Sequence, residues 1–183
     1  MSAVARQVCL SVVLLGAVAS AADGPSGLKP GAPTPSIPVL DVTGSYRGQP
    51  ICYVCEFQDA PSVLAFFRGT GKDTGELIVQ LNDLYLRHKA KGFKAVAMIV
   101  AGESARPWLE QLQASTKLDI PLTVFRRGPR DVAARLYELN PEVENTFLVT
   151  VNRFVSANVA GVRPGNFDRV ASATSAMLAA RGR

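Results

Sequence analysis

The stretch Ser62-Val63-Leu64-Ala65-Phe66-Phe67 is an almost unbroken apolar run with the length of one β-strand. A strand that is apolar on both faces is typical of the centre of a sheet covered on both sides. Two further segments, 94–100 and 120–125, are expected to be buried strands, with helices beginning near Asp73 and Ser104 between them. Strands that alternate with helices predict an α/β domain with parallel neighbours in its sheet.

The second half of the chain predicts a hairpin and a terminal helix. Residues 146–151 and 154–159 flank Asn152-Arg153, and asparagine tolerates the positive φ of a two-residue hairpin turn. Asn166 is expected to cap the last helix. We therefore expect a three-layer α/β fold, with a mixed central sheet, helices on both faces, and a C-terminal hairpin plus helix. A short strand and a short helix complete the pattern, at 39–42 and 129–139.

The N-terminal residues are typical of a secretory signal peptide. A positive charge at Arg6 precedes an apolar run over 8–19, and the small residues Ala19 and Ala21 match a signal-peptidase site. The run is shorter than the roughly 20 residues that a membrane-spanning helix needs. We therefore expect a signal peptide at 1–21 that is removed, with an uncleaved anchor as the alternative.

Removal of the signal peptide would leave two parts. Residues 22–38 are rich in Gly, Pro and Ser and predict a flexible lead-in. Residues 39–183 are long enough for one domain with its own core. We expect this protein to be secreted or periplasmic, with no stable membrane insertion after signal cleavage.

The charge of the chain does not indicate nucleic-acid binding. Its formal net charge is +5, and its one basic cluster, Arg126, Arg127 and Arg130, has no interleaved aromatic residue beyond Phe125. We expect no nucleic-acid partner, and the sequence indicates no particular oligomeric state.

Cys52 and Cys55, in the segment Ile51-Cys52-Tyr53-Val54-Cys55-Glu56, remain after signal removal, because Cys9 lies within the signal peptide. An oxidising compartment predicts that they form a disulfide. They lie in an expected loop, 46–60, before the central strand. Because a strand of this length spans roughly 20 Å, the pair should lie at the opposite end of the sheet from the loop after the strand. The exception is a cysteine loop that folds back along the sheet.

Several motifs resemble one known family when they are taken in order. Residues 40–44 (Leu-Asp-Val-Thr-Gly) and 46–50 (Tyr-Arg-Gly-Gln-Pro) are similar to the first hairpin of redoxins. Residues 62–68 are similar to their central strand, and 146–161 to their closing hairpin. The chain thus resembles the thioredoxin-like superfamily, in its redoxin and peroxiredoxin branch. The resemblance implies a thioredoxin-like fold over 39–183, whereas activity has to be argued from the site.

Two features of this family are missing. In thioredoxins and peroxiredoxins the attacking cysteine follows the central strand, where a helix N-terminus stabilises its thiolate. The equivalent loop here, 69–74, contains no cysteine. The family's cis-proline is expected near 144–146, where the chain has no proline. Because the peroxidatic position is empty, peroxidase activity is less expected than thiol–disulfide exchange.

Three interpretations of the cysteine pair remain open. In the first, by analogy with CxxC enzymes, Cys52 attacks and Cys55 resolves during exchange with partner protein thiols or disulfides. In the second, the pair is a structural disulfide of a non-catalytic binding or scaffold domain, contributing on the order of 2 kcal/mol. In the third it binds haem or metal. However, no His follows the pair as c-type haem requires, and zinc would find only His88 as a further His or Cys ligand. We favour the first, a thiol–disulfide oxidoreductase, and expect no cofactor or metal.

Three other polar residues are assigned no catalytic role. His88 lies near the basic end of the first long helix and is expected to contact terminal carbonyls or solvent. Asp41 and Asp119 are expected to be solvated or turn residues.

Overall fold

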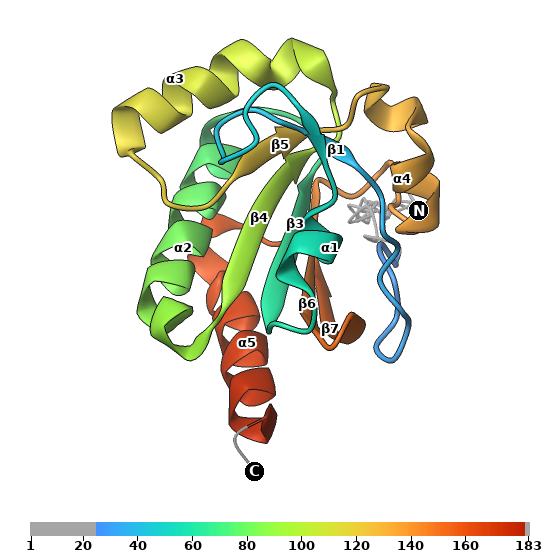
Figure 1. Ribbon diagram of the computed structural model, residues 1–183, viewed down its shortest axis with the longest axis vertical. Coiled ribbons are helices and arrows are strands. Elements are labelled where there is room, and N and C mark those ends of the chain that lie inside the picture. The colour runs from blue at the N-terminus through green and yellow to red at the C-terminus, as the bar shows by residue number, and fades with distance from the viewer. Residues whose placement is uncertain (1–24, 182–183) are drawn as a thin grey trace, which may run out of the picture.

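Seven strands form one mixed sheet in the computed structural model, which describes residues 25–181. The strand order is β2-β1-β5-β4-β3-β6-β7 (Figure 1). The predicted signal peptide at 1–21, with Cys9, lies outside the described residues. The strands are β1 (Val39–Asp41), β2 (Pro50–Ile51), β3 (Ser62–Phe67), β4 (Lys94–Ile99), β5 (Leu122–Val124), β6 (Asn145–Val151) and β7 (Phe154–Ala160).

β3 lies in the middle of the sheet, as its apolar sequence predicts. It pairs in parallel with β4, which pairs in parallel with β5. On its other side β3 is antiparallel to β6, and the hairpin of β6 and β7 turns at Asn152 and Arg153, which both have positive φ. β1 is antiparallel to β5 and to β2. The mixed sheet predicted from the sequence is confirmed.

Helices cover both faces of this sheet. They are α1 (Tyr53–Phe57), α2 (Lys72–His88), α3 (Arg106–Thr116), α4 (Val132–Leu136) and α5 (Asp168–Arg181). The core cluster on one face takes residues from α2, α3 and α5, among them Leu77, Leu109 and Val170. The cluster on the other face takes residues from α1 and α4, among them Tyr53, Val54 and Ala133. Phe67 of β3 belongs to the first cluster and Phe66 to the second, so the three-layer α/β fold is confirmed.

The predicted long helices are present, with ends that differ by a few residues. The differences arise because 3-10 segments adjoin several helices, at Lys89–Lys91, Glu103–Ala105, Gly128–Arg130 and Pro164–Asn166. Within residues 25–181, none of the helices is both long and apolar enough to cross a membrane.

Residues 25–38 pack against the sheet. Leu28 is buried, and the N–H of Gly31 donates to the Val155 carbonyl at 2.8 Å. The N–H of Thr34 donates to the Arg153 carbonyl, also at 2.8 Å. These bonds cover part of the edge strand β7, which would otherwise leave backbone groups unpaired. The composition of the lead-in did not predict these contacts, and the domain limits proposed above stay predictions.

Candidate redox site

A short helix carries both cysteines, where we expected an irregular loop. Cys52 is the N-cap of α1, and Cys55 lies in its first turn. Tyr53 and Val54 are buried and Phe57 packs against the same cluster, so an apolar side fixes α1 to the sheet. The loop prediction was wrong because a helix of 5 residues has little stability of its own and forms through such contacts. The i, i+1, i+4 spacing of these apolar residues was the signal that could have found it.

α1 lies over the face of the sheet and not beyond its end. Figure 1 shows it in front of β3, with its C-terminal end leading to the start of that strand. Its buried residues share a core cluster with Leu64 and Phe66, from the interior of β3. The cysteine segment therefore folds back along the sheet, which is the exception allowed above. The pair lies on the face that α4 also covers.

Cys52 and Cys55 form a disulfide, with their Cα atoms 5.2 Å apart, within the usual range for a disulfide. The N–H of Cys55 donates a hydrogen bond to Sγ of Cys52 at 3.1 Å. The two residues differ in accessibility, because Cys52 is half-buried against the core cluster and Cys55 is exposed. A reacting partner therefore meets the bond mainly from the side of Cys55.

A fully buried carboxylate anchors the start of α1. Oδ2 of Asp41 accepts from the Tyr53 hydroxyl at 2.9 Å and from the Tyr46 N–H at 2.8 Å. Oδ1 accepts from the N–H groups of Thr43 at 3.2 Å and Gly44 at 2.7 Å. Because a buried carboxylate needs such partners, these donors explain why it is tolerated. The expectation that Asp41 is a solvated or turn residue was wrong, because it ends β1 and its buried side chain binds the turn that follows the strand, beside the cysteine helix.

A second link joins the same turn to α1 at the surface. The Tyr46 hydroxyl donates to Oε2 of Glu56 at 2.7 Å. This hydrogen bond, followed by the negative charge of Glu56, raises the pKa of Tyr46. The carboxylate that follows Cys55 in the sequence is therefore held by a specific partner.

We expect the protein to lose stability above about pH 10, where ordinary tyrosines ionise. Burial, followed by the hydrogen bond to Asp41 and the charge of Asp41, raises the pKa of Tyr53 far above the ordinary range. Burial likewise raises the pKa of Tyr137. The native state keeps both protons at a pH where the unfolded chain releases them. Their contribution is therefore complete below about pH 10 and is lost as the pH rises further.

Above about pH 10, each such tyrosine should add about 1.4 kcal/mol per pH unit to the fall in the free energy of unfolding. Urea unfolding at a series of values from about pH 9 to about pH 11 measures it. Tyr137→Phe should remove one tyrosine's share of the slope, and an unchanged slope in that variant would contradict the assignment.

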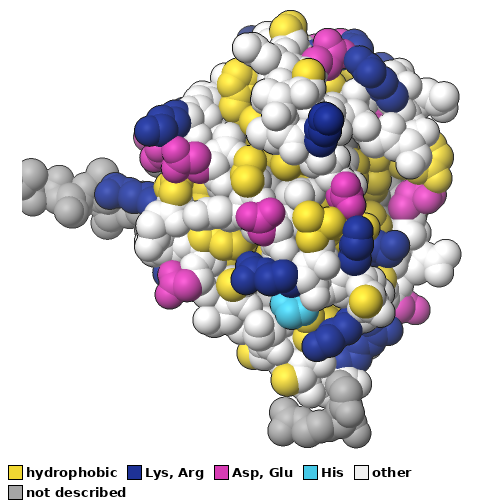
Figure 2. Space-filling model, turned by 90° about the vertical axis from the view of Figure 1, so that its left-hand side faces the viewer, with side chains coloured by type: hydrophobic (Ala, Val, Ile, Leu, Met, Phe, Trp, Pro, Cys, Tyr) yellow, Lys and Arg dark blue, Asp and Glu magenta, His cyan; other side chains and the backbone are white. Residues whose placement is uncertain are grey.

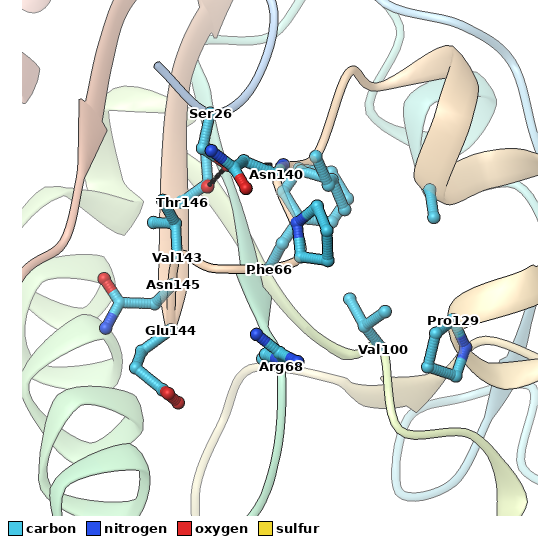
Figure 3. A pocket seen from close by; sticks show the side chains of 13 residues that line it. Ser26, Phe66, Arg68, Val100, Pro129, Asn140, Val143, Glu144, Asn145 and Thr146 are labelled. Carbon is cyan, nitrogen blue, oxygen red and sulfur yellow. Dashed lines mark hydrogen bonds between the residues drawn. The ribbon is translucent and has the colours of Figure 1, made fainter. Parts of the chain in front are cut away.

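The end of β3, where redoxins carry their catalytic cysteine, is built differently here. Of the predicted loop 69–74, residues 72–74 already belong to α2, whose N-cap Gly71 makes no side-chain capping bond. A cavity of about 390 Å³ lies at this helix start. A smaller one of about 100 Å³ shares residues with it and is lined by Phe66, Arg68 and Val100 among others (Figure 3).

Neither of these cavities contains the candidate site. Cys52 and Cys55 are absent from the lining of both. At the position where the family's cis-proline is expected, the chain has Glu144, directly before β6. No peptide bond within residues 25–181 is cis. The sulfur pair is thus displaced from the usual redoxin position, as the sequence predicts.

Residues 25–181 contain no group of three or more His, Cys, Asp or Glu side chains that could hold a metal ion. His88 ends α2, which covers the opposite face of the sheet from α1. Its ring packs edge-on against Phe93, with centroids 6.1 Å apart. Burial, followed by the charges of Lys91 and Arg87, lowers the pKa of His88. Figure 2, viewed from the α2 side, shows charged side chains of both signs scattered over this face.

The fold is that of thioredoxin-like proteins. A thiol:disulfide interchange protein, DsbE, from Chlorobium tepidum superposes with a TM-score of 0.65 at 18% identity, covering 82% of this chain and 99% of its own. Peroxidoxin BcpB from Mycobacterium tuberculosis gives 0.64 at 17% identity, covering 81% and 97%. A secreted Mycobacterium tuberculosis disulfide oxidoreductase homologous to E. coli DsbE gives 0.58 at 13%, covering 77% and 96%. No protein-family model and no curated protein matches the sequence.

Proposed function

We propose that the protein exchanges thiols and disulfides with partner proteins through Cys52 and Cys55. The observation that carries the proposal is a disulfide with one exposed cysteine and one half-buried cysteine whose Sγ accepts an N–H. A hydrogen bond to sulfur stabilises the thiolate, which is the form that attacks and leaves during exchange. The similar structures described as an interchange protein and an oxidoreductase support this class of chemistry.

The proposed exchange needs only the two cysteines and two sulfurs of a partner. A partner thiolate attacks one sulfur of the pair, a mixed disulfide forms, and the other cysteine leaves with the electron pair of the broken bond. A second partner thiolate then displaces the protein's sulfur. The partner gains a disulfide and the protein ends with two thiols. In the reverse direction, the reduced pair reduces a partner disulfide.

A secreted or periplasmic location is part of the proposal. The signal-like N-terminal sequence supports it, as does the similarity to a structure described as secreted. An oxidising compartment would keep the pair oxidised between reactions.

The second candidate function is a binding or scaffold domain with a structural disulfide. Two observations favour it: Cys52 packs against the core cluster, and the end of β3 lacks a cysteine. In this case the pair would only brace α1 against the sheet.

The reduction potential of the pair, together with its turnover of protein disulfides, tests the proposal. We expect a potential above about −300 mV and reduction of insulin disulfides with dithiothreitol as the electron donor. A potential below about −300 mV without turnover is the result expected of the structural alternative. The oxidised and reduced full chains should be compared in the same buffer.

A further inference from the structure

We infer that a partner's sulfur bonds to Cys55, and that Cys52 is the sulfur that leaves. This inference rests on the proposed function and deepens it. It reverses the order expected by analogy with CxxC enzymes, in which the first cysteine of the motif attacks and the second resolves.

Access is the first argument. An exchange reaction requires the incoming sulfur to approach the attacked sulfur along the disulfide bond, so access to that sulfur controls the rate. Cys55 is exposed in the first turn of α1. Cys52 is half-buried at the start of α1, where it packs against the core cluster. A protein partner that approaches from solvent therefore meets the more exposed Cys55 first.

The hydrogen bond is the second argument, and it points the same way. Sγ of Cys52 accepts the N–H of Cys55 at 3.1 Å already in the disulfide. The same N–H stabilises the negative charge that forms on Cys52 when the bond breaks, and a better stabilised thiolate leaves faster. No corresponding donor to Sγ of Cys55 occurs among residues 25–181. Access and leaving ability therefore favour one direction of cleavage.

The balanced step follows from these two arguments. A partner thiolate forms a bond to Sγ of Cys55, the bond between Cys55 and Cys52 breaks, and its electron pair stays on Cys52 as a thiolate. A second partner thiol, after losing its proton to solvent, displaces Sγ of Cys55, and the partner sulfurs are then oxidised to a disulfide. In reverse, Cys55 attacks a partner disulfide and Cys52 resolves the mixed disulfide.

The charge beside Cys55 indicates the class of partner. Glu56 follows Cys55, is exposed, and is held by the Tyr46 hydroxyl at 2.7 Å. Arg47, from the same turn as Tyr46, forms an ion pair with Glu110 at 3.1 Å. A thiol that attacks Cys55 therefore approaches a fixed negative charge. Partners whose reacting cysteine is flanked by Lys or Arg should react faster than partners with acidic flanks.

Mapping the first mixed disulfide tests the order of the sulfurs. The oxidised full chain is treated briefly with neutral 2-mercaptoethanol, quenched in acid, and alkylated with N-ethylmaleimide. Trypsin releases both cysteines in one peptide, 48–68, because no Lys or Arg lies between Arg47 and Arg68. Fragmentation at Tyr53 or Val54 then assigns each label. We expect the mercaptoethanol adduct on Cys55 and the maleimide on Cys52, at least about tenfold in excess at the earliest times.

The possible outcomes separate this inference from the proposed function. An adduct mainly on Cys52 overturns the inference and leaves thiol–disulfide exchange intact. A pair that gives no adduct at either cysteine contradicts both.

Charged thiols test the class of partner. The rate ratio of cysteamine to mercaptoacetate, measured at low salt on the oxidised protein, should fall about threefold in Glu56→Gln, since each probe loses its interaction with one nearby charge. Glu76→Gln removes the same charge from α2, on the opposite face of the sheet, and should leave the ratio unchanged. Equal ratios in wild type and Glu56→Gln would overturn the preference for basic partners.

Discussion

Serine in place of either Cys52 or Cys55 is expected to abolish turnover of a disulfide substrate. Exchange needs one sulfur to form the mixed disulfide and a second to resolve it, so a single remaining thiol stops after the first step. Insulin reduction with dithiothreitol, corrected for the uncatalysed rate, measures the loss. Cys52→Ser keeps the exposed Cys55 and should accumulate a mixed disulfide with the partner.

The double variant, with serine at both positions, separates activity from stability. It should lose all turnover but only about 2 kcal/mol of unfolding free energy, because the disulfide closes a very short loop. Urea unfolding measures the second quantity, and the reduced wild type serves as its matched control. Turnover that survives in the double variant would show that the activity does not come from this pair.

The architecture was predictable because it depends on patterns that are local in the sequence. The apolar run 62–67 indicates a strand buried on both faces, and the hairpin around Asn152 follows from two strand-like segments, 146–151 and 154–159, that flank a turn residue. The first long helix follows from apolar residues at helical spacing, which became the buried face of α2. The apolar pattern that predicts this burial can be recognised in each segment alone, without knowing which segments pack against it.

The helix that carries the cysteines was missed because its stability is not local. A helix of 5 residues forms only when Tyr53 and Val54 pack against the sheet and the Tyr53 hydroxyl reaches Asp41. The same reason explains Asp41, whose burial depends on donors from a turn and from α1. A sequence window around Asp41 contains no sign that its side chain would be buried.

The sequence predicts which two cysteines form the candidate site, but not which of their sulfurs a partner can reach. An oxidising compartment and the short spacing of Cys52 and Cys55 predict a disulfide, which the structure contains. Which of the two sulfurs a partner can reach depends on the side of α1 that faces the core, and therefore on the packing of the whole face. The analogy with other CxxC proteins gives the opposite order to the one that we infer, because the analogy takes no account of this packing.

Asp41→Ala is expected to give the largest loss of stability among single substitutions near the site. The variant leaves the part-buried backbone N–H groups of Gly44 and Tyr46 and the buried Tyr53 hydroxyl without their acceptor. An unpaired buried donor costs about 1–3 kcal/mol, and because solvent can reach the two part-buried N–H groups once the turn relaxes, the total should be about 4 kcal/mol. Because a typical domain is stable by about 5–15 kcal/mol, the variant should remain folded but be strongly sensitised to urea.

Three further variants make this expectation specific. Tyr53→Phe removes a single donor and should cost about 1–2 kcal/mol. Asp119→Ala is the matched control, because that carboxylate is about half exposed and only pairs with Lys89 at 3.2 Å, so its loss should cost less than about 1 kcal/mol. Asp41→Asn keeps the shape of the side chain but replaces one acceptor oxygen with an NH2 group, which faces donors and cannot accept from them. Its cost should therefore fall between the costs of Tyr53→Phe and Asp41→Ala. If Asp41→Ala proves no more sensitive to urea than Asp119→Ala, the buried carboxylate does not hold α1.

Because the anchor positions Cys52, the same Asp41 variants should also lower the excess of mercaptoethanol adduct on Cys55 over Cys52.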